Sequence, residues 1–291
     1  MPSPPCVLDA LRVTPLADGT GRYRASISEH WNAPVHPNGG LTSAVALRAL
    51  ELELAHPHQR LRSFSTTFVS TVPCGDADIV VERLRIGRRM SQLRADLRGH
   101  GGSEPGHLVT AAFGEARPGF DFEHLRAPEV GPPMDYPLPA DPPPGVPVFR
   151  PPFFQNVESR RVRMFSSFET DWEGGDATAI RWIRYRCAAR LPDGRIDPLS
   201  FIALADTMPG AVAQYLGPGY PFFHAPSVDL SMRMIADTED EWLLARTVAH
   251  WAGDGYGSAE VALWDEHRRL VAHATQMMLM RLVRPEELAA R

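Results

Sequence analysis

Cysteine and long apolar runs are both scarce in this sequence of 291 residues. Its three cysteines, Cys6, Cys74 and Cys187, lie far apart, and none belongs to a CxxC or Cys/His spacing. Neither a disulfide framework nor a zinc site is therefore expected. No stretch of about 18 apolar residues is present to span a membrane. The N-terminal MPSPPCVLDALR lacks the basic and apolar regions of a signal peptide. We expect a cytoplasmic protein without a membrane partner.

The sequence also lacks the short motifs of several large enzyme classes. Gly102-Ser103-Glu104-Pro105 fails the GxSxG pattern of a nucleophile elbow at its last position. No GxGxxG follows a strand-like segment, and no phosphate-binding GxxxxGKS/T occurs. The 11 histidines form neither HxxxH nor HExxH, which are spacings of helical zinc sites. We therefore expect no metal and no cofactor.

The charge balance limits the classes of binding partner. Apolar residues make up 44% and charged residues 22% of the sequence, the proportions of a globular protein. A formal net charge of -5 gives no reason to expect binding to nucleic acid or to an anionic membrane. Most of the cationic residues are arginines, and several of them cluster locally, so the binding of a small phosphate-bearing ligand stays possible.

A proline-rich stretch divides the sequence into two parts. Residues 132–152 read PPMDYPLPADPPPGVPVFRPP, where proline recurs too often for a helix or a central strand. We predict an extended surface linker over 131–152. It separates an N-terminal domain, 1–130, from a C-terminal domain, 153–291, and each has an ordinary domain size.

The two parts repeat one order of elements. In the first, LTSAVALRALELELA follows Gly39-Gly40 and predicts a helix that is apolar around most of its circumference and stops at Pro57. In the second, a helix is predicted over 198–215, kinked or interrupted at Met208-Pro209-Gly210. Strands are predicted at 23–27, 61–71, 78–87, 90–99 and 107–113 in the first part, and at 162–170, 177–189, 225–235, 242–251, 257–265 and 270–282 in the second.

This order of elements indicates a fold class. An apolar helix followed by four antiparallel strands buries that helix only if the sheet curls around it. We therefore predict an α+β fold in which each domain has a long central helix wrapped by a curved antiparallel sheet.

Asp206 is the polar residue that stands out, because it lies within the apolar segment FIALADTMPGA. A carboxylate in a buried helix is unfavourable unless it is ionised and paired or lies beside a cavity. A local role fits equally well, since Asp206 could cap the helix where Pro209 disturbs it. The residues alone do not separate a functional acid from a structural one.

Five segments of the sequence resemble one protein family. They are WIRYRCAARLPDGRIDPLSFIALADTMP at 182–209, APSVDLSMRM at 225–234, LVAHATQMMLMR at 270–281, and WNAPVHPNGGLTSAVALRALE and ERLRIGRRMSQLRADLR in the first part. Together they resemble the acyl-CoA thioesterase II-like family of double hotdog proteins over nearly the whole chain. The resemblance implies two fused hotdog domains, a place in fatty acid metabolism, and hydrolysis of an acyl-CoA or acyl-carrier thioester. Assembly into a homo-oligomer is common in that family, and this sequence does not specify it.

The resemblance also implies the catalytic residues. The family orients a water with an aspartate, a threonine or serine, and a glutamine, which match Asp206, Ser227 and Gln276 here. Asp206 is then the general base, and the other two hold the water or donate to developing charge. Ser227 keeps the hydroxyl of the more usual threonine but lacks the methyl that restricts its rotamer. Structural interpretations stay open, with Ser227 as an edge-strand serine and Gln276 as a buried amide paired elsewhere.

Two further groups are candidates for substrate binding. Asn38-Gly39-Gly40 enters the first helix, whose free N–H groups could polarise a thioester carbonyl or bind an anion; a simple helix start explains it equally well. Arg88, Arg89 and Arg94 could pair with CoA phosphates. The alternation in SQLRADLRG favours the other interpretation, a solvated strand face.

Two other functions remain open from the sequence. Hotdog proteins include hydratases and dehydratases of CoA-bound or carrier-bound intermediates, a role that fits specialised metabolism, and those hydratases use an Asp/His pair. The nearest candidate, His36, lacks a convincing partner at that spacing. A non-catalytic acyl-ligand binder is the second alternative, if Ser227 does not position water. Release of thiol, hydration of an enoyl-CoA, and binding without turnover distinguish the three functions.

Overall fold

The computed structural model describes residues 5–17, 21–144 and 151–283 of the chain. The strands of the first half are β1 (Val13–Pro15), β2 (Arg22–Ile27), β3 (Arg60–Phe68), β4 (Gly75–Arg85), β5 (Met90–Gly99) and β6 (His107–Gly114). Those of the second half are β7 (Val157–Arg163), β8 (Thr178–Tyr185), β9 (Phe223–His224), β10 (Ser227–Met234), β11 (Leu243–Gly253), β12 (Tyr256–Trp264), β13 (Leu270–Leu279) and β14 (Arg281–Leu282). The helices are α1 (Val7–Ala10), α2 (Gly39–Leu54), α3 (Pro152–Gln155), α4 (Ser200–Ala205) and α5 (Pro209–Leu216), with single 3-10 turns at η1 (Glu29–Trp31) and η2 (Pro133–Asp135).

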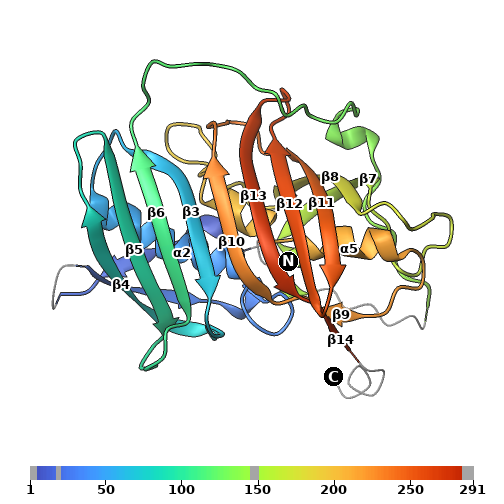
Figure 1. Cartoon of the computed structure of the whole chain (residues 1–291), viewed down its shortest axis with the longest axis horizontal. Helices are drawn as coiled ribbons and strands as arrows, with labels where there is room; N and C mark the ends of the chain where they lie inside the picture. The colour runs from blue at the N-terminus through green and yellow to red at the C-terminus, as the bar shows by residue number, and fades with distance from the viewer. Residues whose placement is uncertain (1–4, 18–20, 145–150, 284–291) are drawn as a thin grey trace.

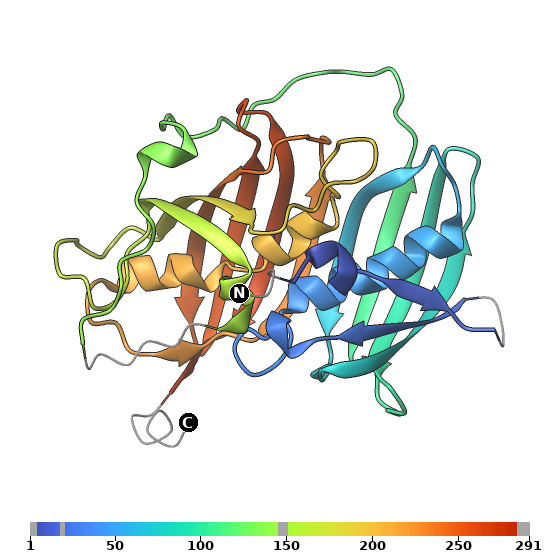
Figure 2. The ribbon, with the colours of Figure 1, turned by 180° about the vertical axis from the view of Figure 1, so that it is seen from behind.

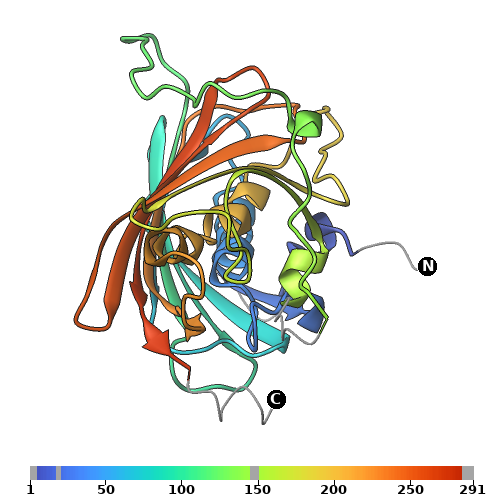
Figure 3. The same ribbon diagram turned by 90° about the vertical axis from the view of Figure 1, so that its right-hand side faces the viewer.

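One large antiparallel sheet dominates the described part of the chain. Its twelve strands run in the order β1-β2-β4-β5-β6-β3-β10-β13-β12-β11-β8-β7, and β9 pairs with β14 separately. The middle strands of the sheet, from β4 to β11 in this order, lie in front of the helices in Figure 1 and behind them in Figure 2. Seen from the side in Figure 3, the sheet curls around α2, α4 and α5. None of the described helices is long and apolar enough to cross a membrane.

Helix α2 is capped at both ends. The Asn38 side chain accepts a hydrogen bond from Leu41 N at 2.9 Å, which is the usual interaction of an N-cap asparagine. The helix ends at Ala55, which adopts a left-handed conformation with φ 48°, two residues before Pro57. Its side chains are buried on most sides, Val45 among them, because the sheet wraps the helix.

The second predicted helix is interrupted, as expected from its proline. Helix α4 ends before Asp206, and α5 begins at Pro209. Proline cannot donate to the helical ladder and its ring clashes with the preceding turn, so the chain leaves helical geometry at Asp206 (φ −74°, ψ 48°). The break starts two residues earlier than the sequence predicts.

The eight strands predicted after the two helices are present, and β5 has the predicted bounds; the last is divided into β13 and β14. The strand predicted over 162–170 differs, because β7 covers 157–163. The residues that follow form a turn in which Ser166 N donates to Glu169 Oε2 at 2.7 Å. A side chain that satisfies nearby backbone groups competes in this way with strand pairing. Strand β8 also ends early, at Tyr185 and not at Ala189.

Strands β3 and β10 join the two halves into one sheet. They pair antiparallel with Ser65 opposite Ser231, and the two hydroxyl oxygens lie 2.9 Å apart. Helices α2 and α4 pack against each other beside this junction. A single cluster of buried apolar side chains runs through both halves.

The chain that follows β6 crosses to the second half, and the proline-rich segment continues there (Figure 1). Residues 145–150 of the predicted 131–152 linker lie outside the described residues. The start of the linker and the residues just before it pack against the second half, since Trp182 Nε1 donates to Gly131 O at 3.1 Å and Arg268 donates to Pro128 O at 3.0 Å. These contacts attach the segment to the outer side of the second half.

Candidate active site

Asp206, Ser227 and Gln276 lie far apart in the sequence and meet in the structure. Ser227 Oγ donates a hydrogen bond to Asp206 Oδ1 at 3.1 Å. Gln276 Nε2 donates to Ser227 Oγ at 2.7 Å and also to Asp206 Oδ1. The three predicted side chains therefore form one hydrogen-bonded cluster.

Each member of the cluster comes from a different element. Asp206 follows the last turn of α4, where its N–H donates to Ile202 O at 3.0 Å. Ser227 is the first residue of β10, and Gln276 lies on the neighbouring strand β13. The β10–β13 register shifts between Ser227 and Asp229, an irregularity that redirects side chains. A helix break and a strand irregularity thus bring the three side chains together.

The N-terminus of α2, from the other half of the chain, completes the site. Gly40 N donates to Asp206 Oδ2 at 2.7 Å, and Asn38 Nδ2 donates to Asp206 O at 3.3 Å. A Cβ on Gly40 would lie 2.5 Å from Ile202 O and 2.8 Å from Asp206 Cβ. A Cβ on Gly39 would lie 2.8 Å from the Phe68 ring. The two glycines therefore allow the helix to approach the carboxylate.

Burial sets the acidity of Asp206. Removal of the carboxylate from water raises its pKa to about 6, although hydrogen bonds from Gly40, Gln276 and Ser227 oppose the change. The ionised form is held by those donors and by the positive end of the α2 dipole. A carboxylic acid with a pKa near neutrality can both take and return a proton at physiological pH.

Gln276 is the most buried member of the cluster, with 3% of its surface exposed, whereas Asp206 and Ser227 are half-buried. Its amide N–H2 faces the carboxylate because an ionised carboxylate only accepts hydrogen bonds. Within the described residues, the opposite atom, Gln276 Oε1, is buried and has no hydrogen-bond partner. Such an atom marks a place where a water or a ligand group can be held.

A buried threonine and histidine support the α2 end of the site and were not predicted from the sequence. Thr42 Oγ1 donates to Gly39 O at 2.9 Å and lies 2.9 Å from His107 Nδ1. Burial lowers the pKa of His107 to about 4, so its ring is neutral. The His107 ring also packs edge-on against Phe68, with 4.7 Å between ring centroids. His107 is the first residue of β6 and lies in register with the inward-facing residues of that strand. This alternation is the sequence signal that could have indicated a buried histidine.

The three arginines predicted to pair with CoA phosphates lie away from the cluster of Asp206, Ser227 and Gln276. Arg88 and Arg89 occupy the β4–β5 turn, where Arg89 O accepts from Glu115 N at 3.0 Å. This turn adjoins the start of β3, whereas Asp206 lies near the Phe68 end of that strand. Arg94 lies on the exposed side of β5 and pairs with Glu82 at 2.8 Å. The structure does not bring these three arginines to Asp206.

The site offers no constellation for metal binding. In residues 5–17, 21–144 and 151–283, no group of three or more His, Cys, Asp or Glu side chains could hold a metal ion. His36, considered for a hydratase, is an exposed residue of the loop before α2. The arrangement can position a water molecule against a carboxylate next to a helix N-terminus.

The sheet, its enclosed helices and this site fit a hotdog-fold enzyme of the thioesterase class. The family descriptions "Acyl-CoA thioesterase N-terminal domain" and "Acyl-CoA thioesterase C-terminal domain" match residues 27–114 and 128–280. The chain belongs to the acyl-CoA thioesterase family.

Solved structures show the same fold. A hot dog fold protein from Alicyclobacillus acidocaldarius is 24% identical, with a TM-score of 0.79, covering 96% of this chain and 98% of that chain. An acyl-CoA thioesterase II from Mycobacterium marinum is 20% identical, with a TM-score of 0.72, covering 96% of this chain and 99% of that chain. At these identities the likeness establishes the hotdog fold. No curated protein matches the sequence.

Proposed function

We propose that this protein hydrolyses an acyl-CoA thioester, or the equivalent acyl-carrier thioester, to a free acid and a thiol. The proposal rests on the cluster of Asp206, Ser227 and Gln276 beside the N-terminus of α2. A half-buried carboxylate, a hydroxyl and a carboxamide that share hydrogen bonds are the groups needed to orient one water molecule.

Asp206 is the general base in this proposal. Its Oδ2 accepts a hydrogen bond from Gly40 N, and a carboxylate oxygen can accept more than one. A water that donates there transfers its proton to Asp206 as its oxygen attacks the thioester carbonyl. The tetrahedral intermediate then expels the thiolate, which takes the proton back from Asp206. Asp206 ends the cycle ionised, and no covalent enzyme intermediate forms.

Ser227 and Gln276 position the base and the water. Both donate to Asp206 Oδ1, which leaves Oδ2 as the atom that meets the water. The unpartnered Gln276 Oε1 can accept the second water proton, which would aim the oxygen lone pair at the substrate. The partial positive charge at the N-terminus of α2 suits the oxyanion that develops on the thioester carbonyl.

The proposal extends to the organisation of the chain. We interpret residues 1–130 and 153–291 as two fused hotdog domains that pair through β3 and β10, with residues 131–152 as the linker. The α2–α4 contact supports this interpretation, because each half supplies one central helix to the shared interior. The catalytic side chains come from the second domain and the helix N-terminus from the first, so neither domain would be active alone.

Asp206→Asn tests the reaction. Asparagine keeps the shape of the side chain but cannot take the water proton, so we expect kcat to fall by roughly 10²–10⁴-fold. Release of free thiol from a panel of acyl-CoAs, followed with a thiol-reactive chromophore, measures the effect. Ser231→Ala on the same strand is the matched control, because its hydroxyl contacts Ser65 and not the cluster.

Two results would contradict the proposal. The first is an absence of turnover by the wild-type protein across short, long, branched and aromatic acyl-CoAs. The second is an Asp206→Asn variant with wild-type kcat. Reversible addition of water to an enoyl-CoA would instead support the hydratase alternative, and tight binding of an acyl-CoA without turnover would support the binder.

A further inference from the structure

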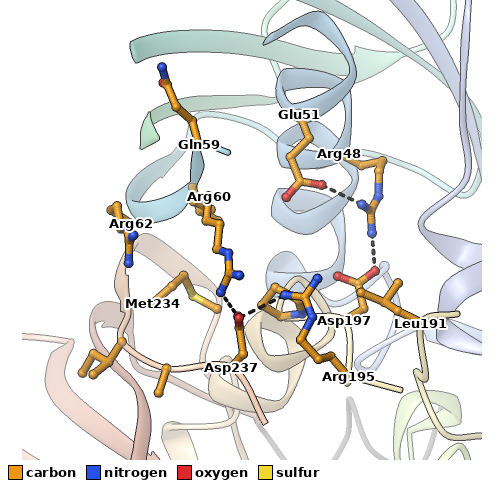
Figure 4. Close-up of a pocket in the computed structure, with 14 residues that line it drawn as sticks. Arg48, Glu51, Gln59, Arg60, Arg62, Leu191, Arg195, Asp197, Met234 and Asp237 are labelled. Atoms are coloured by element: carbon orange, nitrogen blue, oxygen red, sulfur yellow. Dashed lines mark hydrogen bonds and ion pairs between the residues drawn. The ribbon is translucent and has the colours of Figure 1, made fainter. Parts of the chain in front are cut away.

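A pocket of about 260 Å³ lies between the two halves, away from Asp206. It is lined by side chains from α2, from the start of β3, from the end of β10 and from the segment that precedes α4. Figure 4 shows Arg60 and Arg195 directed at Asp237, and Arg48 between Glu51 and Asp197. Nothing in the proposed reaction uses these residues.

The pocket occupies a position related to the candidate active site by an approximate two-fold axis. Helices α2 and α4 are antiparallel, because Gly40 contacts Asp206 at one end and Arg48 contacts Asp197 at the other. Strands β3 and β10 are also antiparallel about the Ser65–Ser231 pair. The start of β10 therefore lies at one site and the start of β3 at the other. At the second position Arg48 of α2 contacts Asp197, which precedes α4.

Charged side chains make up half of the lining of this pocket. Its lining contains four arginines, namely Arg48, Arg60, Arg62 and Arg195, against three carboxylates, namely Glu51, Asp197 and Asp237. Burial raises the pKa of Glu51 to about 7, so its negative charge is incomplete at neutral pH. Asp193 beside the pocket also pairs with Arg195, so the four arginines face four carboxylates, of which Glu51 is only partly ionised. The pocket therefore carries a small excess of positive charge at neutral pH.

Two of these arginines, Arg60 and Arg62, have donor capacity to spare. Arg60 pairs with the carboxylate of Asp237 alone among the described residues, although a guanidinium has five N–H donors, whereas Arg195 pairs with both Asp237 and Asp193. Arg62 donates to the backbone oxygen of Gly114 at 3.0 Å and has no carboxylate partner among the described residues. An anion that enters the pocket can therefore meet guanidinium groups without breaking every existing ion pair.

The remaining lining is mostly apolar. Leu61, Leu191, Met234 and Ile235 contribute hydrocarbon surface, and Gln59 is the one further polar side chain. Since one water takes up about 30 Å³ of liquid, the pocket of about 260 Å³ has space for a molecule of about nine non-hydrogen atoms and is too small for a whole CoA. A short hydrocarbon with one anionic end satisfies the charge, the lining and the size.

We propose that this pocket is a second ligand site that binds a small organic monocarboxylate. Arg60 and Arg62 hold the carboxylate, and the hydrocarbon part packs against Met234 and Leu61. A small excess of positive charge and an apolar wall favour such a molecule over inorganic phosphate, which is smaller and has no apolar part. The site does not depend on the hydrolytic activity, because it shares no side chain with the Asp206 cluster.

Titration with hexanoate tests the proposal in the full-length protein. The methyl resonance of Met234, in protein labelled at the methionine methyl groups and assigned with Met234→Leu, reports occupancy of this pocket. We expect a saturable shift, and an apparent Kd at least tenfold weaker in Arg62→Gln. Arg163→Gln is the matched control, because Arg163 is an ion-paired arginine on β7 outside the pocket. Asp206→Asn should bind hexanoate as the wild type does.

The outcomes separate this site from the proposed active site. No shift of the Met234 resonance, or an equal Kd in the wild type and Arg62→Gln, would overturn the proposal even if thioester hydrolysis is confirmed. Tighter binding of inorganic phosphate than of hexanoate would overturn the assignment to a monocarboxylate. Loss of hexanoate binding in Asp206→Asn would place the ligand at the other site and overturn the proposal.

Discussion

Replacement of Asp206 by asparagine should stabilise the fold while it removes the activity. Burial raises the pKa of Asp206 from 3.8 to about 6, which means that the ionised form is held less favourably in the folded protein than in the unfolded chain. At neutral pH this difference corresponds to about 3 kcal/mol of lost stability. Asparagine resembles the protonated carboxyl group in shape and carries no charge, so it avoids that loss.

The hydrogen bonds around position 206 can adapt to the amide. Asparagine can turn its oxygen towards Gly40 N and its N–H2 towards Gln276 and Ser227. Gln276 can then rotate its amide so that Oε1, which lacks a partner in the described structure, accepts from the new side chain. Ser227 Oγ can accept as well as donate. The stabilisation of the folded state by Asp206→Asn should therefore be a large fraction of the lost stability of about 3 kcal/mol.

Urea unfolding at several pH values measures this effect. A carboxyl group whose pKa is raised by folding favours the folded state at low pH, and that contribution is lost as the pH rises from about 4 to about 6. Wild type and Asp206→Asn should therefore be similarly stable at pH 4, and the variant should be more stable by about 2–3 kcal/mol at pH 7. Equal stabilities at pH 7, or a difference that does not change with pH, would refute the burial argument.

Three further predictions concern the same site. Gly40→Ala should lower the free energy of unfolding by about 2–3 kcal/mol and reduce turnover, because the new Cβ would meet α4 at Ile202 O. Gly119→Ala is the control, since nothing lies within 4 Å of its Cβ, and it should change stability by less than about 0.5 kcal/mol. Equal stabilities of the Gly40→Ala and Gly119→Ala variants would contradict the close approach of α2 to α4. The ratio kcat/KM should rise with pH up to about 6 and then level off, since Asp206 must be ionised to accept a proton; a flat profile between pH 5 and pH 7 would exclude it as the base. Ser227→Ala should reduce kcat by about tenfold or more while Ser227→Thr keeps it, because the hydroxyl positions the carboxylate; the reverse order would remove Ser227 from the mechanism.

The local elements follow from the sequence because their causes are local. Helix α2 is marked by Asn38 at its start and by Pro57 after its end, and an apolar surface runs between them. The bounds of β5 follow from strict alternation, in which Leu93 and Leu97 face the core. The interruption of the second helix was expected from Pro209, which cannot continue a helical ladder.

The candidate residues came from the sequence in two ways. Asp206 was conspicuous as an acid within an apolar segment, but its neighbours in the sequence did not separate a base from a helix cap. Ser227 and Gln276 were singled out by resemblance to a family, since a serine and a glutamine on strands have many ordinary roles. The hydrogen bonds that join the three belong to the tertiary structure.

Contacts between distant segments decided the rest. The sequence could not tell that Gly40 from one half donates to Asp206 from the other, because that bond depends on how α2 and α4 cross. Arg88 and Arg89 are conspicuous as neighbours in the sequence, but strand order places them at the opposite end of β3 from Asp206. The arginines of the second pocket come from segments that the sequence pattern alone does not connect. Periodicity and capping act within a few residues, so the sequence determines the helices and strands. The position of a side chain relative to another element depends on strand order and helix packing, and only the tertiary structure decides these.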